Sequence, residues 1–242
     1  MVEHLLLLPG LMCDQSVWQN QIDALADIAV STCADYGTLD SLTGMAEAAL
    51  HAAPERFSVA GHSMGGRVAL EIYRLAPRRV TRIALLNTGY LPLASGAAGE
   101  QETRRRQELA ALARSRGMRA MLGEWLPPMI DSRRIHDAAL VNSITEMMSR
   151  KTPEIFAAQV RALLARPDAG PVLEAIRCPA LLVSGREDGW SGPAQHADMF
   201  ARIPASKIPA SRLVIVPDCG HMSTMERPAE VSAALREWLN PA

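Results

Sequence analysis

The chain contains few aromatic residues and few cysteines, and cysteines are the residues that mark disulfide-rich and many metal-binding proteins. Of its 242 residues only 4% are aromatic and four are cysteines. The four thiols are far apart in the sequence and form neither a Cys-x-x-Cys pair nor a metal-ligand spacing: they are Cys13, Cys33, Cys178 and Cys219. We therefore expect reduced, mostly buried thiols and no metal site.

Charge and long apolar runs are also lacking. The formal net charge is −1, so no global field attracts nucleic acid or an anionic membrane. No apolar run approaches the roughly 18 residues of a membrane-spanning helix. Residues 1–4 have no basic region of the kind that opens a signal peptide. We expect a cytoplasmic protein without nucleic-acid or membrane partners, and the sequence leaves its oligomeric state open.

The apolar pattern that is present predicts an α/β fold. Short apolar runs alternate with segments of helical periodicity, which favours right-handed crossovers and a mostly parallel sheet covered by helices on both faces. Thr43 is the expected N-cap of one of these helices. The pattern predicts about six strands, at residues 4–8, 28–32, 56–60, 82–87, 179–184 and 213–216.

This alternation stops between residues 89 and 176. The segment carries helical patterns and prolines but no convincing strand. We interpret it as a helical cap inserted between two strands of the sheet. Residues 1–88 and 177–242 each lack a full sheet, so we expect them to form one core together.

Residues 59–66 form the most informative segment of the chain. Their sequence is Val-Ala-Gly-His-Ser-Met-Gly-Gly, in which a strand ends in Gly-x-Ser-x-Gly and a helical pattern follows. This context is typical of a nucleophile elbow, a sharp turn that exposes a serine above the sheet edge. Gly61 and Gly65 fit this turn because a Cβ atom at either position would collide with a neighbouring strand or helix. Ser63 is therefore the predicted nucleophile, rather than a surface serine in a glycine-rich turn.

A serine hydroxyl needs a base within hydrogen-bond reach, and that base needs an orienting carboxylate. His221 is the best base among six histidines, because it follows the last strand at the sheet edge where sites form. Asp188, in the loop after the fifth strand, is the candidate carboxylate. The adjacent Glu187 remains an alternative on physical grounds, whereas Asp218 is more simply explained by a local turn.

The same chemistry requires an oxyanion hole. One expected donor is the backbone N–H of Met64, which follows the nucleophile directly. The other is expected from the loop after the first strand, where Gly10 allows close approach and the Leu11 N–H is favoured.

Four segments together resemble the α/β-hydrolase superfamily, in particular its small serine esterases and lactonases. They are Leu-Leu-Leu-Leu-Pro-Gly-Leu (5–11), Gly-His-Ser-Met-Gly-Gly (61–66), Leu-Val-Ser-Gly-Arg-Glu-Asp (182–188), and Gly-His-Met with Glu-Arg-Pro (220–222 and 226–228). The resemblance implies a spatial strand order 2-1-3-4-5-6 and favours Asp188 over Glu187. It also implies the family's order of Ser63, Asp188 and His221 along the chain. Pro9 is a departure, because the family often has histidine there.

The substrate-binding residues are harder to predict. Met12, Trp125 and Trp190 are the candidates that we place beside the cleft, within an apolar pocket suited to short or medium acyl groups. Six arginines in the cap suggest a rival, a site for anionic groups, although most of them are expected to be solvated. They are Arg104, Arg105, Arg106, Arg114, Arg116 and Arg119. Arg67 resembles a residue of relatives that bind acidic substrates and catalyse elimination.

We therefore expect a serine hydrolase that cleaves a small carboxylic ester, lactone or thioester and needs no cofactor. A lyase or a carbon–carbon bond hydrolase with the same residues is an alternative, as is a non-catalytic receptor for a small ligand. The fold alone does not decide among these activities. The presence of Ser63, Asp188 and His221 argues against the receptor.

Overall fold

A computed structural model describes residues 3–204, 208 and 210–240. Six parallel strands form one sheet in the order β2-β1-β3-β4-β5-β6, which confirms the predicted fold class and strand order. The strands are β1 (Glu3–Leu8), β2 (Ala29–Cys33), β3 (Phe57–His62), β4 (Val80–Leu86), β5 (Ala180–Gly185) and β6 (Arg212–Val216). Strands β3 and β5 are buried along their whole length, as expected for interior strands of a parallel sheet.

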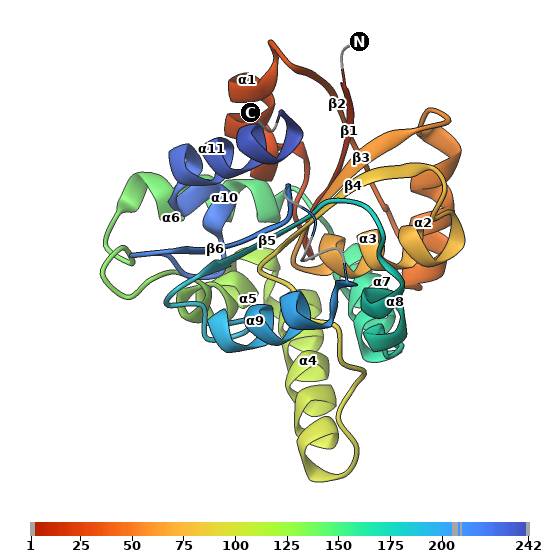
Figure 1. The fold of residues 1–242 in the computed structure, drawn as a ribbon. Coiled ribbons are helices and arrows are strands. Elements are labelled where there is room, and N and C mark those ends of the chain that lie inside the picture. The colour runs from red at the N-terminus through yellow and green to blue at the C-terminus, as the bar shows by residue number, and fades with distance from the viewer. Residues whose placement is uncertain (1–2, 205–207, 209, 241–242) are drawn as a thin grey trace.

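Helices cover both faces of this sheet (Figure 1). On one face α1 (Gln19–Leu25), which follows the 3-10 turn η1 (Gln15–Trp18), packs against α11 (Pro228–Leu239). Beside them lies the short helix α10 (Ser223–Glu226). The other face carries α2 (Leu42–Ala52), α3 (Met64–Leu75) and α9 (Pro193–Arg202). Helix α3 begins directly after Ser63 and contacts both β3 and β4. The turn at Ser63 therefore lies at the carboxyl end of β3, a central strand with β1 and β4 on either side.

The N-cap of α2 differs from the sequence prediction. Ser41, and not Thr43, has the extended backbone of an N-cap, and its side chain accepts a hydrogen bond from the Gly44 N–H. Thr43 lies inside the helix and donates a hydrogen bond to the Glu71 carboxylate instead. Serine and threonine are both good caps, so this short segment offered two nearly equivalent choices.

The segment between β4 and β5 is helical. It contains α4 (Ala97–Arg116), α5 (Met118–Trp125), η2 (Pro127–Met129), α6 (Ala138–Ser149), α7 (Pro153–Leu164) and α8 (Gly170–Ala175). Helix α4 projects from the body of the molecule in Figure 1, and it packs against α5 and α7. The last helix, α8, contacts α3 and α9 on the face of the sheet. We propose that residues 89–176 act as a cap over the edge of the sheet where Ser63 lies.

Three of the four tryptophans are buried. Trp18 and Trp238 are fully buried in the core, and Trp125 is 7% exposed. Trp190 differs, because 42% of its surface is exposed although it is a large apolar side chain. A single exposed tryptophan is not by itself evidence of a binding surface, so its significance depends on what lies beside it.

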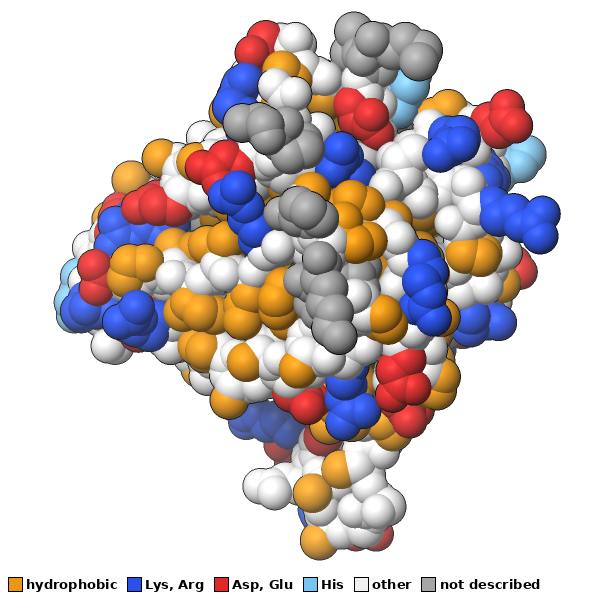
Figure 2. All heavy atoms as spheres, in the orientation of Figure 1, with side chains coloured by type: hydrophobic (Ala, Val, Ile, Leu, Met, Phe, Trp, Pro, Cys, Tyr) orange, Lys and Arg blue, Asp and Glu red, His pale blue; other side chains and the backbone are white. Residues whose placement is uncertain are grey.

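The outer surface is mixed in charge. Figure 2 shows acidic and basic side chains next to each other over one face of the molecule, in keeping with the small net charge of the chain. Within the described ranges, no helix combines the length and the apolar character needed to cross a membrane.

Candidate active site

The carboxyl edge of the sheet carries unusual backbone geometry. Among the described residues, four other than glycine have a positive φ angle, and each lies within four residues of the carboxyl end of a strand: Met12 (65°), Ser63 (54°), Asn87 (47°) and Asp218 (52°). Side chains other than glycine rarely adopt this conformation, and such strain gathers at functional sites. This strain makes the carboxyl edge of the sheet the candidate active site.

The turn around Ser63 depends on two glycines. A Cβ atom at Gly61 would lie 2.2 Å from the carbonyl oxygen of Gly65. A Cβ atom at Gly65 would lie 2.0 Å from the carbonyl oxygen of Leu8 on β1. These distances confirm the steric reason that we inferred for the glycines of the motif. They also bring β1, β3 and α3 close together around the serine.

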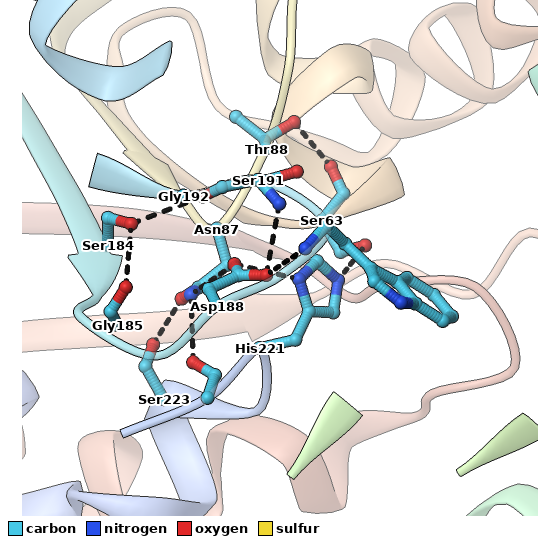
Figure 3. A network of polar contacts seen from close by, with 12 residues as sticks. Ser63, Asn87, Thr88, Ser184, Gly185, Asp188, Ser191, Gly192, His221 and Ser223 are labelled. Atoms are coloured by element: carbon cyan, nitrogen blue, oxygen red, sulfur yellow. Dashed lines mark hydrogen bonds and ion pairs between the residues drawn. The ribbon is translucent and has the colours of Figure 1, made fainter. Parts of the chain in front are cut away.

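Ser63, His221 and Asp188 form one chain of hydrogen bonds (Figure 3). The distance from Ser63 Oγ to His221 Nε2 is 2.8 Å, and the distance from His221 Nδ1 to Asp188 Oδ2 is 2.9 Å. His221 is 4% exposed and Asp188 is 5% exposed. The structure thus brings together the three side chains that the sequence analysis selected from loops after β3, β5 and β6.

The proton positions in this chain follow from the carboxylate. An ionised carboxylate only accepts hydrogen bonds, so His221 carries its proton on Nδ1 and uses Nε2 to accept from the Ser63 hydroxyl. Burial alone would raise the pKa of the Asp188 carboxyl, but the charge that His221 carries when protonated, and its hydrogen bond, both lower that pKa. Asn87 and the Ser191 backbone add hydrogen bonds, and the pKa of Asp188 is held below its usual value.

The other two candidate carboxylates point elsewhere. Glu187 pairs with Arg133 at 2.9 Å and accepts a hydrogen bond from the Cys219 N–H at 2.9 Å. Asp218 pairs with Arg133 and Arg227. Asp188 alone among the three has the hydrogen bond to the His221 ring.

The sequence analysis predicted the backbone N–H groups of Leu11 and Met64 as oxyanion donors. Met64 is the first residue of α3, so its N–H has no acceptor within the helix. The Leu11 N–H donates to no acceptor among the described residues. Both residues line the cavity that Ser63 also lines. We propose that these two N–H groups form the oxyanion hole that the sequence analysis predicted.

That cavity has a volume of about 620 Å³. Trp125 and Trp190 both line it, and their ring centroids are 5.8 Å apart. The Trp190 ring also lies 5.2 Å from the His221 ring. Met12 is fully buried, and the cavity wall does not include it, so we leave it out of the proposed binding residues.

Sequence reasoning missed three polar residues that hold the site in place. Asn87 donates hydrogen bonds to Asp188 Oδ2 and to the Gly220 carbonyl. Glu226 is buried and accepts hydrogen bonds from backbone N–H groups on both sides of His221. Gln159 on α7 accepts a hydrogen bond from the Met12 N–H at 2.9 Å. No local pattern marks Asn87 or Gln159, because their partners lie far away in the sequence. Glu226 lies within six residues of these backbone partners and belongs to the Glu-Arg-Pro segment, but that segment did not indicate its role.

His62, the residue before Ser63, is a buried support of the base. Its Nε2 lies 2.8 Å from the backbone carbonyl oxygen of His221, to which it donates. Burial, followed by the nearby His221, lowers the pKa of His62 to about 4. The ring is therefore neutral at pH 7.

The cysteines and the metal-binding residue types form no further site. Cys13 and Cys219 are buried free thiols, and burial raises the pKa of both well above its ordinary value. In the part of the chain that the structure describes, no group of three or more His, Cys, Asp or Glu side chains is arranged to hold a metal ion.

An exposed serine on a strand-to-helix turn, followed by a carboxylate and a histidine from later strand ends, defines the hydrolases built on a parallel α/β sheet. Residues 5–234 match the model of the alpha/beta hydrolase family. The chain belongs to this family.

Two curated relatives share the name pimeloyl-[acyl-carrier protein] methyl ester esterase. The protein from Nitrosomonas europaea is 27% identical over 93% of this chain and 91% of its own length. The protein from Aromatoleum aromaticum is 26% identical over 81% of this chain and 79% of its own length. Among solved structures, a thermophilic esterase from Thermogutta terrifontis has a TM-score of 0.83 and 26% identity. The match covers 98% of this chain and 89% of that one.

Proposed function

We propose that this protein is a serine hydrolase that cleaves a small carboxylic ester, lactone or thioester through an acyl-enzyme. The observation that carries the proposal is the chain of hydrogen bonds from Ser63 through His221 to Asp188 at the wall of the cavity. Membership of the alpha/beta hydrolase family and relatives named as esterases support it. The chemistry needs no metal or organic cofactor, because side chains and backbone amides supply every group.

Acylation begins when Ser63 Oγ attacks the carbonyl carbon of the substrate. His221 Nε2 takes the hydroxyl proton, and Asp188 stabilises the imidazolium that forms. The N–H groups of Leu11 and Met64 donate to the oxyanion of the tetrahedral intermediate. When the intermediate collapses, the bond to the alcohol or thiol breaks and His221 Nε2 gives its proton to the leaving group. The acyl group remains on Ser63.

Deacylation repeats these steps with water as the nucleophile. His221 Nε2 takes a proton from the water as it attacks the acyl carbonyl carbon, and the same two amides hold the oxyanion. Collapse breaks the bond to Ser63 Oγ, which recovers its proton from His221. The products are the carboxylic acid and the free enzyme.

The walls of the cavity fit an acyl chain. Trp125, Leu109, Met129 and Leu163 contribute apolar side chains to the wall. Each methylene that is removed from water there contributes about 0.8 kcal/mol. This gain raises kcat/KM only where the transition state retains it.

Covalent labelling tests the proposal directly. A fluorophosphonate probe should add its mass to a peptide that contains Ser63, because the probe traps activated serines. Ser63→Ala should abolish labelling and lower kcat for a panel of esters, lactones and thioesters by about 10⁴-fold or more. Ser115→Ala is the matched control, since Ser115 is an exposed serine on α4, and it should leave both unchanged.

Two results would contradict the proposal. One is labelling of another serine while Ser63 stays unmodified. The other is turnover without a covalent intermediate. Hydroxylamine should intercept the acyl-enzyme as a hydroxamate under single-turnover conditions, and its failure to do so with an active protein would favour the lyase alternative.

A further inference from the structure

Arginine side chains line the cavity that Ser63 lines. Arg67 comes from α3, Arg106 from α4, and Arg166 from the loop after α7. The exposed Arg105 lines the cavity as well. The only lining carboxylates among the described residues belong to Glu102 and Glu124, and Glu124 is solvent-exposed. The wall therefore carries more positive than negative charge.

One carboxylate serves two of these guanidinium groups. Arg166 forms a bidentate pair with Glu102, at 2.8 Å to Oε1 and 2.7 Å to Oε2. Arg106 Nε donates to the same Oε1 at 2.9 Å. Glu102 thus neutralises one unit of charge where two cations meet.

Arg67 has no carboxylate of its own. Its Nη1 donates to the backbone carbonyl of Leu91 at 3.0 Å, and no acidic group in the described ranges lies within ion-pair distance. Arg166 Nε lies 3.4 Å from the same Leu91 oxygen. Two guanidinium groups therefore converge on one neutral acceptor beside the cavity.

The electrostatic cost of this arrangement is visible in the titration of Arg67. Burial, and then the charge of Arg166, lowers the pKa of Arg67 to about 9. Arg67 is still protonated at pH 7, so the cavity keeps an uncompensated positive charge there. Arg67 is partly exposed where it lines the cavity, and its guanidinium group has only the neutral Leu91 carbonyl as a partner among the described residues, so it is available to an anionic group that enters the cavity.

We infer that Arg67, together with Arg106 and Arg166, forms a subsite for a carboxylate on the substrate, some atoms away from the ester carbonyl that Ser63 attacks. Guanidinium groups match a carboxylate in charge and in planar shape, and the Arg166–Glu102 pair shows that geometry already. This inference rests on the proposed function and names its substrate class. The substrate is an ester, lactone or thioester that also bears a free carboxylate.

The proposed subsite lies close to the nucleophile in the fold. Ser63 directly precedes α3 and Arg67 lies in the first turn of that helix, so one rigid element fixes the nucleophile and the anion anchor relative to each other. The apolar residues that line the same cavity, among them Leu109 and Leu163, suit the chain that links the two ends of such a substrate. A carboxylate held by Arg67 would fix the distance from anchor to scissile carbonyl, which lowers the entropy cost of orienting the ester.

The decisive experiment compares two ligands that differ only in charge. The half methyl esters of glutaric, adipic and pimelic acid bear the carboxylate, and the corresponding methyl ester monoamides are their neutral isosteres. Binding is measured by calorimetry with the Ser63→Ala protein, so that it does not depend on turnover. We expect at least one half ester to bind about tenfold or more tightly than its amide, as charge-assisted hydrogen bonds predict.

Substitution of the arginines then locates the effect. Arg67→Gln should remove most of the preference for the half ester over its methyl ester monoamide, both in binding and in kcat/KM. The rate at which the ester group of the monoamide is hydrolysed should change only a few-fold. Arg106→Gln should act in the same direction and serves as a second variant if Arg67→Gln does not fold. Arg104→Gln is the matched control, because Arg104 is an exposed neighbour on α4 and does not line the cavity.

Failure of this inference differs from failure of the proposed function. Equal binding and equal kcat/KM for half esters and amides, unchanged in Arg67→Gln, would overturn the carboxylate subsite and leave the hydrolase intact. Tight, Arg67-dependent binding without hydrolysis of any ester would support the subsite and refute the proposed reaction. Preference for a phosphate-bearing ester over every half ester would overturn the assignment to a carboxylate.

Discussion

His62 makes the stability of the nucleophile elbow depend on pH. Its ring is buried beside Ser63 and donates from Nε2 to the His221 carbonyl, and burial lowers its pKa to about 4. The informative substitution is His62→Gln, since a glutamine amide places a donor near the position of Nε2 but does not titrate in this range. This change separates the protonation of His62 from the hydrogen bond that it makes.

The sign and size of the effect follow from linkage. In the unfolded chain His62 takes up a proton near pH 6.5, whereas in the folded protein it stays neutral down to about pH 4. Between these values the unfolded state binds more protons, so the free energy of unfolding falls as the pH falls. At about 1.4 kcal/mol per pH unit, the whole window is worth about 3 kcal/mol. Below about pH 4 His62 is protonated in both states, so it lowers the free energy of unfolding no further.

The assay is urea unfolding of both proteins at a series of pH values from about 7 to about 4. Other titrating groups are present in both proteins, so the difference between the two curves isolates His62. Wild type should lose about 3 kcal/mol more stability than His62→Gln across this range. Parallel curves would refute the reasoning, as would an NMR titration that places the pKa of His62 near its ordinary value.

Two further predictions concern the geometry around the base and the oxyanion loop. Gln159→Leu leaves the buried Met12 N–H without an acceptor, so we expect kcat to fall about tenfold or more with little change in KM. Gln159→Glu keeps an acceptor oxygen for the Met12 N–H and should therefore retain more of kcat than Gln159→Leu. An equal fall of kcat in the two variants would contradict a role for this hydrogen bond. Asp188→Asn should lower kcat by about 10⁴-fold because a neutral amide neither fixes the His221 tautomer nor stabilises its imidazolium as the carboxylate does, whereas Glu187→Gln should change kcat only a few-fold. The reverse order would show that the carboxylate is wrongly assigned.

The sequence predicted the parts of the site that depend on local chemistry. The strand, the two glycines and the helix start around Ser63 are contiguous, so one pattern contains the whole turn. His221 and Asp188 follow predicted strands, and parallel strands bring their carboxyl ends to one edge. Topology alone therefore placed these three residues near each other before any contact was known.

The supporting residues could not be predicted in this way. Asn87 and Gln159 are ordinary polar residues in their own segments, and their roles arise from partners 101 and 147 positions away. Arg166 lies outside the arginine-rich stretch that the sequence made conspicuous. Within that stretch Arg104 is exposed, and Arg106 is partly buried and bound to Glu102. Helix orientation decides which arginine faces the cavity, and orientation is a property of the packed molecule.

Backbone strain and distant hydrogen bonds occur together along the carboxyl edge of the sheet. Met12 has a positive φ, and the hydrogen bond from its N–H to the Gln159 side chain restrains it there. The Ser63 carbonyl accepts from Thr88 Oγ1 at 2.7 Å, and the Asn87 N–H donates to β5 at 2.8 Å. A strained conformation persists only where its surroundings hold it, so each restraint maintains a geometry that the local sequence disfavours. Loss of one restraint should therefore reduce turnover through displaced donors and acceptors, even where the nucleophile, the base and the carboxylate are all retained.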